Sequence, residues 1–111
     1  MLSKIFGGGG DAIDVVEAHR RAVSGEVELI DVRERSEWSA GHAPMAKHVP
    51  LGSLAEQLST LSQQGRPIAF ICGSGARSGN ACSAARRAGI DAFNVKGGMG
   101  AWSRAGLATT R

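Results

Sequence analysis

The continuous apolar run at 68–72, Ile-Ala-Phe-Ile-Cys, limits the folds open to this chain more than any other feature. It is far shorter than the roughly 20 apolar residues that cross a membrane, and Pro67 and Gly73 bound it. A strand without a polar face is buried on both sides, as in the centre of a parallel sheet. The run therefore predicts a parallel sheet with both faces covered.

The rest of the chain alternates between strand and helix patterns. Strand patterns occur at 27–32, 46–49 and 91–95, and helix patterns at 14–23, 34–40, 51–61 and 78–88 and around Trp102. In the first helix, Asp14 followed by Glu17 forms a capping pattern. The leucines at 51, 54, 58 and 61 fall on one helix face. This alternation predicts an α/β domain of the three-layer α/β/α class, with helices on both faces of a mainly parallel sheet.

The chain has 111 residues, 42% of them apolar, which is enough for one domain with one core. Its 16 glycines are about twice the usual share, and four of them form the run at 7–10. That run predicts a flexible N-terminal segment at 1–10 and a single domain at 11–111. The sequence does not decide whether residues 4–6 form a strand.

Charge is distributed unevenly along the chain. Residues 1–56 hold nine acidic and six basic side chains, whereas residues 57–111 hold one acidic and seven basic side chains. A basic half could attract small anions, an acidic protein or RNA, and charge alone does not choose among them. Only five residues are aromatic and no run of Lys or Arg exceeds two, so we do not expect a nucleic-acid ligand.

No segment has the length of a membrane span or the order of a signal peptide, because the glycine run interrupts the short apolar start. We therefore expect no membrane partner and a cytoplasmic protein. Thiols stay reduced in that compartment, and two cysteines are too few for a disulfide-stapled scaffold. We expect Cys72 and Cys82 to be free rather than bonded to each other.

The segment after the apolar run carries the strongest chemical signal. It reads Cys72-Gly73-Ser74-Gly75-Ala76-Arg77-Ser78 and joins the buried strand to a helix with an alanine-rich face. Ligands of open α/β sheets bind at the carboxyl ends of strands, where Cys72 lies. The glycines allow backbone N–H groups to converge, the helix N-terminus adds partial positive charge, and Arg77 adds a full charge. All three favour a thiolate, so Cys72 is predicted to have a low pKa and to be reactive.

Other sites that glycines and histidines can form are not supported. Gly73, Gly75 and Ser78 lack the third glycine of a dinucleotide fingerprint, and no phosphate-loop lysine follows them. The histidines at 19, 42 and 48 lack zinc-site spacing, and His19 falls on an apolar helix stripe, where a packed ring is expected. Cys82 lies inside a helix and is predicted to be a small core residue. We expect neither a metal nor a cofactor.

Several short motifs occur in the order found in one family. They are Asp31-Val32-Arg33-Glu34, Glu37-Trp38-Ser39-Ala40-Gly41-His42, Val49-Pro50-Leu51, the cysteine loop at 72–78, and Gly97-Gly98 ahead of Ala101-Trp102 and Gly106. Together they span residues 13–107. With them the chain resembles a single-domain rhodanese, a sulfurtransferase that carries sulfur on a cysteine. The resemblance implies a five-stranded parallel sheet flanked by helices.

The resemblance also implies a function. Cys72 would take a sulfane sulfur from thiosulfate or another persulfide-like donor and, as a persulfide, pass it to a thiol or to cyanide. The residues that would hold the substrate are Gly73, Ser74, Gly75, Ala76, Arg77 and Ser78. Asp31, Arg33 and His42 are expected to support the site. The expected partners are a small anionic sulfur donor and a thiol acceptor, and the alternative is a non-catalytic or sulfur-carrier module that docks a protein partner.

Loop length separates this family from related phosphatases and arsenate reductases, which share its fold. Those enzymes place the arginine one residue farther from the cysteine, whereas four residues separate Cys72 from Arg77 here. A shorter loop encloses a smaller space, suited to one sulfur rather than to a tetrahedral oxyanion. We therefore do not expect phosphatase activity.

Overall fold

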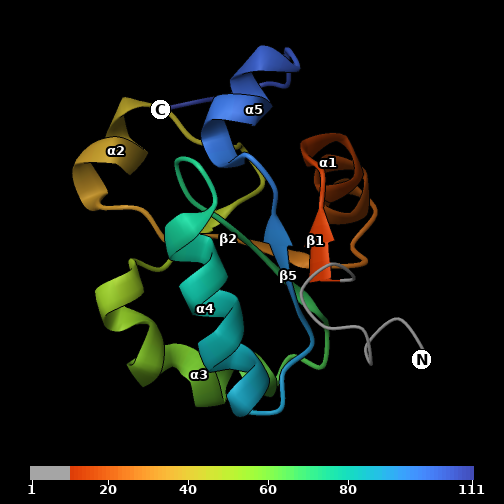
Figure 1. Ribbon diagram of the computed structural model, residues 1–111, viewed down its shortest axis with the longest axis vertical. Helices are drawn as coiled ribbons and strands as arrows, with labels where there is room; N and C mark the ends of the chain where they lie inside the picture. Colours follow the sequence, from red (N-terminus) through yellow and green to blue (C-terminus); the bar gives the residue numbers. More distant parts are fainter. Residues whose placement is uncertain (1–10) are drawn as a thin grey trace.

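The computed structural model describes residues 11–111, so the expected flexible segment at 1–10 and the question of a strand at 4–6 lie outside the described residues. Within this range five parallel strands form one sheet in the order β1-β5-β4-β2-β3 (Figure 1). The strands are β1 (Ala12–Ile13), β2 (Glu28–Asp31), β3 (Lys47–His48), β4 (Ile68–Ile71) and β5 (Ala92–Val95). The helices are α1 (Val15–Val23), α2 (Arg35–Ala40), the 3-10 helix η2 (Leu51–Ser53), α3 (Leu54–Ser62), α4 (Ala76–Arg87) and α5 (Gly98–Arg104).

Helices cover both faces of the sheet, and each face has its own core cluster. α1 and α5 pack together on one face, where Val15 and Trp102 are buried. α3 and α4 pack together on the other face, where Leu61 and Ala81 are buried. This arrangement confirms the predicted three-layer α/β/α fold.

Alternate residues of β4 enter the two clusters. Ile68 and Phe70 lie with Cys72 in the α3–α4 cluster, whereas Ala69 and Ile71 lie in the α1–α5 cluster. All five are at most 1% exposed. The strand has no polar side chain because each of its faces meets a layer of helices.

The edge strand β1 is the one strand that the sequence patterns did not predict, because it has no periodic pattern. Ile13 pairs with Val95 at the edge of the sheet, and the Lys96 N–H donates to the Ile13 carbonyl at 2.8 Å. Two residues are too few to show the alternation by which a strand is recognised. The family resemblance therefore gave the correct number of strands where periodicity could not.

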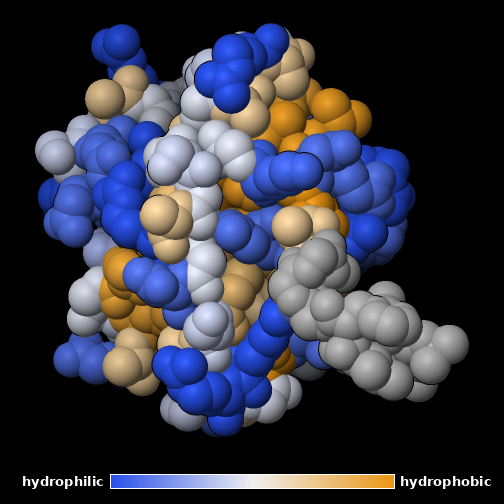
Figure 2. Space-filling view, in the orientation of Figure 1, coloured by the Kyte–Doolittle hydropathy of each residue, from blue (hydrophilic) through white to orange (hydrophobic). Residues whose placement is uncertain are grey.

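The first helix forms as the sequence predicts. Asp14 caps α1 and accepts a hydrogen bond from the Glu17 N–H at 2.8 Å. His19 packs against Trp102 with its ring centroid at 5.6 Å, which confirms a packed histidine. Figure 2 shows apolar side chains among charged ones around α1. None of the helices within residues 11–111 combines the length and the apolar character that crossing a bilayer requires.

Two helices begin at other residues than the sequence predicts. α4 starts at Ala76, two positions before the predicted residue 78, because Gly75 takes a positive φ of 117° and turns the chain directly into the helix. This start places Arg77 in the first turn of α4. The single helix predicted at 51–61 is divided into the 3-10 helix η2, which starts at Leu51, and the α-helix α3, which starts at Leu54.

Candidate active site

Cys72 follows β4 directly, at the end of the sheet where α4 and α5 begin. The residue is only 1% exposed. β2 flanks β4 here, and the Val32 N–H donates to the Ile71 carbonyl at 3.0 Å. The loop between β4 and α4 lies at the upper end of the sheet in Figure 1, beside α5. Cys72 therefore occupies the carboxyl end of a central strand, as predicted.

Backbone N–H groups of the loop point at the cysteine sulfur. The Gly75 N–H donates to Sγ at 3.1 Å and the Ser78 N–H at 3.3 Å. The Ser78 hydroxyl lies 3.3 Å from the same atom, and Ser78 is fully buried. The loop therefore forms the predicted convergence of N–H groups. Within the described chain, the N–H groups of Gly73, Ala76 and Arg77 do not donate to the sulfur.

Hydrogen bonds to the sulfur make the Cys72 thiol more acidic although the residue is buried. Burial raises the pKa of the Cys72 thiol, but hydrogen bonds to the sulfur lower it by more. The Ser78 hydroxyl and the N–H groups of Ser78, Gly75 and Ser74 supply this lowering. The resulting pKa lies below the ordinary value of a cysteine, so the loop favours the thiolate.

Arg77 is bound to a carboxylate and not to the sulfur. Its guanidinium donates to both carboxylate oxygens of Glu37, at 2.6 and 2.9 Å. These bonds lower the pKa of Glu37 to about 2, so the pair is ionic at neutral pH. The guanidinium lies close to the loop backbone. A Cβ atom added to Gly73 would be only 3.1 Å from Arg77 Nη2. The full charge that the sequence predicts beside the thiolate is thus shared with Glu37, a residue to which sequence reasoning gave no role.

The start of α5 supports the cysteine from another side. The Met99 N–H donates to the Cys72 carbonyl at 2.7 Å. Gly98 has a φ of 56°, and a Cβ there would lie 2.4 Å from the Cys72 carbonyl oxygen and 2.6 Å from Gly73 atoms. Only glycine permits such an approach. Since β5 and β4 are neighbours, the position of Gly97-Gly98 just after β5 is the sequence signal for this contact.

A polar network lies beneath the loop, between α4 and β5. The Ser78 hydroxyl donates to Asn94 Oδ1 at 2.5 Å, and Asn94 Nδ2 donates to the Gly75 carbonyl at 3.1 Å. Gly79 leaves room for this amide, because a Cβ there would lie 3.5 Å from Nδ2. Sequence reasoning missed Asn94. A polar residue near the end of a strand of the buried sheet was the available signal.

Asp31 and Arg33 form a buried ion pair at the carboxyl end of β2. Arg33 Nη2 donates to Asp31 Oδ2 at 2.8 Å and to the Gly41 carbonyl at 2.7 Å. Asp31 is fully buried and Arg33 is 7% exposed. The pair therefore fixes the end of α2, the helix that carries Glu37.

His42 lies in an aromatic stack and not at the sulfur. The Trp38 ring stacks with His42 at a centroid distance of 3.5 Å and with His48 at 4.7 Å. His42 Nδ1 donates to the Trp38 carbonyl and His48 Nε2 to the Arg33 carbonyl, each at 2.8 Å. In the described structure His42 therefore contacts the segment around α2 and makes no bond to Cys72.

The second cysteine differs from the first in its surroundings. Cys82 lies in α4 and is buried in the α3–α4 cluster, which confirms its prediction as a core residue. Burial raises the pKa of its thiol to about 12. Both cysteines are free thiols, as expected. Only Cys72 therefore has the surroundings of a reactive thiol.

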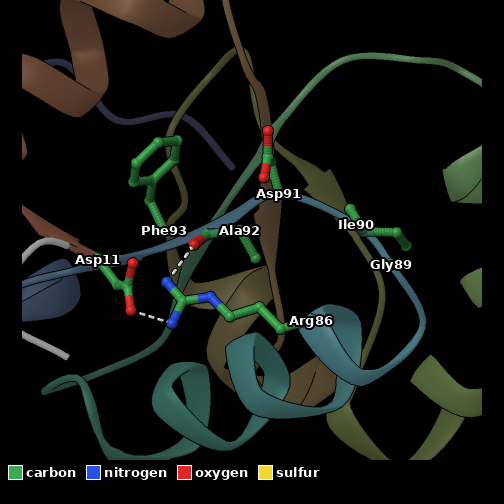
Figure 3. A pocket seen from close by; sticks show the side chains of 7 residues that line it. All are labelled: Asp11, Arg86, Gly89, Ile90, Asp91, Ala92 and Phe93. Carbon is green, nitrogen blue, oxygen red and sulfur yellow. Dashed lines mark hydrogen bonds and ion pairs between the residues drawn. The ribbon is translucent and has the colours of Figure 1, made fainter. Parts of the chain in front are cut away.

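Two cavities lie away from Cys72. One of about 340 Å³ lies between the end of α4 and the start of β5. Figure 3 shows Arg86 crossing it to reach Asp11 and the Ala92 carbonyl. Another, of about 210 Å³, shares Gly89, Ile90 and Asp91 with it. Within residues 11–111 no three His, Cys, Asp or Glu side chains are grouped to hold a metal ion.

We predict that Cys72 forms a thiolate with a midpoint below about 8.5, the ordinary pKa of cysteine, because the loop donors favour the charged sulfur. Far-ultraviolet thiolate absorbance measures this well, since the chain has no tyrosine and the pKa of Cys82 is about 12. Subtracting the titration of Cys72→Ser removes every other signal. A midpoint at or above the ordinary value would contradict the role of the loop.

Gly98→Ala is predicted to displace the cysteine backbone, because the added Cβ would collide with the carbonyl groups of Cys72 and Gly73. We expect the Cys72 midpoint to rise and the free energy of unfolding to fall by about 1–3 kcal/mol. Gly52→Ala is the matched control, since no atom lies within 4 Å of its Cβ position. Equal effects of the two substitutions would show that the approach of α5 is unimportant.

Comparisons with known proteins point to one family. The sequence profile described as "Rhodanese-like domain" matches residues 14–105. The Bacillus subtilis protein "Putative sulfurtransferase YtwF" is 43% identical over 77 residues, which are 69% of this chain and 74% of that protein. The "HTH-type transcriptional regulator Rv0324" of Mycobacterium tuberculosis is 36% identical over 104 residues, which are 93% of this chain but only 46% of the regulator.

A solved structure agrees with the sequence matches. A rhodanese-like domain protein from Staphylococcus aureus superposes with a TM-score of 0.75 at 30% identity, over 83% of this chain and 90% of that one. The range matched by the family profile includes the cysteine loop at 72–78 and the pair Asp31 and Arg33. The chain belongs to the rhodanese-like domain family.

Proposed function

We propose that this protein is a sulfurtransferase that moves a sulfane sulfur from thiosulfate or a persulfide to a thiol, through a persulfide on Cys72. The observation that carries the proposal is a strand-end cysteine whose sulfur accepts two loop N–H groups within 3.3 Å. Donors at fixed positions stabilise negative charge on the atom that they face. The lowered pKa of Cys72 favours the nucleophilic thiolate. The relative named as a sulfurtransferase supports the same activity.

In the first step the Cys72 thiolate attacks the outer sulfur of thiosulfate. A new S–S bond forms at Cys72, the S–S bond of thiosulfate breaks, and sulfite leaves with the electron pair. The product is an anionic persulfide, whose terminal sulfur we place against the N–H groups of Gly75 and Ser78. The same donors then serve the empty thiolate and the loaded persulfide in turn.

In the second step an acceptor thiolate attacks the terminal sulfur. The S–S bond of the persulfide breaks, Cys72 leaves as a thiolate, and the acceptor carries the sulfur away as its own persulfide. A low thiol pKa makes Cys72 a good leaving group. Cyanide can replace the thiol and forms thiocyanate. Because the cycle requires a reduced cysteine, we propose the cytoplasm as its compartment.

The alternative role, a non-catalytic or sulfur-carrier module, does not require the cysteine loop to react with a small sulfur donor. A module that only docks a partner has no need of donors aimed at a thiolate. A carrier takes sulfur from a partner protein and gains none from a small donor alone. Reaction with thiosulfate therefore separates the enzyme from both alternatives.

Incubation with thiosulfate is expected to add one sulfur atom to the protein, which intact mass spectrometry detects. The adduct should be absent from Cys72→Ser and present in Cys82→Ser, the matched control that removes the other thiol. Cyanide should then remove the adduct and release thiocyanate. A wild-type protein without an adduct, or the same adduct on Cys72→Ser, would contradict the proposed function.

The Arg77–Glu37 pair is expected to tune the approach of an anionic donor. Thiosulfate is a dianion, so Glu37→Gln, which leaves Arg77 unpaired, should raise the second-order rate of sulfur uptake by about two- to tenfold at low salt. Arg77→Ala leaves Glu37 unpaired and should lower that rate by a similar factor. Added salt should shrink both differences.

Loading rates followed by mass spectrometry measure these effects. Glu17→Gln is the matched control, because Glu17 forms a similar ion pair with Arg20 on α1. Rates that respond alike to all three substitutions would show that the charge beside the loop has no specific part in donor binding.

A further inference from the structure

The Ser78 hydroxyl has one proton and three neighbours that can accept it. Asn94 Oδ1 lies at 2.5 Å, the Gly75 carbonyl at 3.2 Å and Cys72 Sγ at 3.3 Å. A hydroxyl donates one hydrogen bond at a time. Ser78 is fully buried, so the choice is made among these three atoms. Whether the sulfur receives a hydrogen bond from Ser78 therefore depends on which of the three acceptors the hydroxyl faces.

The amide of Asn94 is held in one orientation. Its Nδ2 donates to the Gly75 carbonyl at 3.1 Å, which turns Oδ1 toward Ser78. The opposite orientation would place Oδ1 against that carbonyl, with two acceptors facing each other. Asn94 thus presents only an acceptor to the Ser78 hydroxyl, and it does so at the shortest of the three distances.

The protonated sulfur fits this arrangement. The Cys72 S–H can donate to the Ser78 oxygen while the Ser78 O–H donates to Asn94, so that the three groups form one continuous chain. Every polar atom of the chain then has a partner, which is the arrangement that buried polar groups favour.

The thiolate fits the arrangement less well. If Ser78 turns its proton to the sulfur, two oxygens remain 2.5 Å apart with no proton between them. If the Ser78 hydroxyl keeps its hydrogen bond to Asn94, the thiolate has only the N–H donors of the loop. The thiol proton leaves to solvent in both cases, and one hydrogen bond of the chain is lost.

We propose that Asn94 competes with Cys72 for the Ser78 proton and thereby sets how readily the thiol ionises. Asn94 is a positioning residue, because it acts through Ser78 and does not touch the sulfur. In a persulfide, Sγ has no proton and no charge, so Ser78 keeps its bond to Asn94 at no cost. Asn94 would then favour the loaded cysteine over the empty thiolate. That consequence rests on the proposed function, whereas the ionisation itself does not.

The other ionisable groups of the site stay the same in every variant of residue 94. They are Arg77 with Glu37, Asp31 with Arg33, Arg104 on α5, and the stacked rings of His42 and His48. Substitution of residue 94 leaves all of them in place. Differences between variants at residue 94 therefore report on the Ser78 proton.

Thiolate titration tests the proposal, with each variant referenced to its own Cys72→Ser background. Asn94→Ala should lower the Cys72 midpoint by about 0.5–1 unit, because Ser78 becomes free to donate to the sulfur. Asn94→Asp should raise the midpoint, because a carboxylate holds the Ser78 proton more firmly and adds negative charge. Asn80→Ala, at an exposed asparagine of α4, is the matched control and should leave the midpoint unchanged.

The same substitutions in a Ser78→Ala background complete the double-mutant cycle. Without the hydroxyl, Asn94→Ala should no longer lower the midpoint. A purely structural role predicts that Asn94→Ala raises the midpoint, with or without Ser78, and that result would overturn the proposal. If Asn94→Asp does not fold, the cycle of the two alanine variants alone decides. No sulfur donor is used, so failure of the proposed function would not affect this result.

Discussion

A sulfur buried at the end of a strand needs hydrogen-bond donors, and the rest of the site follows from how the backbone supplies them. The N–H groups of Gly75 and Ser78 reach Sγ because the chain turns back directly after Cys72, through the positive φ of Gly75. The same turn starts α4, whose N-terminal end also favours negative charge. The glycine at 98 lets α5 approach the cysteine backbone from another side. Two helix starts thus converge on one cysteine.

Dipoles, more than full charges, determine the electrostatics at the sulfur. Arg77, in the first turn of α4, shares its charge with Glu37, and Arg33 shares its charge with Asp31. The loop N–H groups remain as the fixed donors to the sulfur, and hydrogen bonds to that atom lower the pKa of Cys72. Such donors suit a single anionic sulfur, which needs short contacts of fixed direction. They also explain how a nearly inaccessible cysteine can still favour its thiolate.

Local patterns allowed much of the fold and part of the site to be predicted from the sequence. The apolar run at 68–72 and the cap at Asp14 are local signals, and the cysteine loop is one continuous segment. The two-residue strand β1 gives no such signal. Glu37 lies 40 positions from Arg77, and Asn94 lies 16 positions from Ser78. Only the order of the strands brings these partners together, so a linear pattern could not assign them.

The most direct test asks whether the Cys72 thiolate is the species that takes up sulfur. The rate of sulfur loading from thiosulfate, followed by intact mass across a range of pH, is compared with the thiolate titration of the same protein. We predict that the loading rate rises with pH and levels off with the midpoint of the Cys72 titration. A loading rate that does not change across that midpoint, or sulfur found on a residue other than Cys72, would contradict this mechanism.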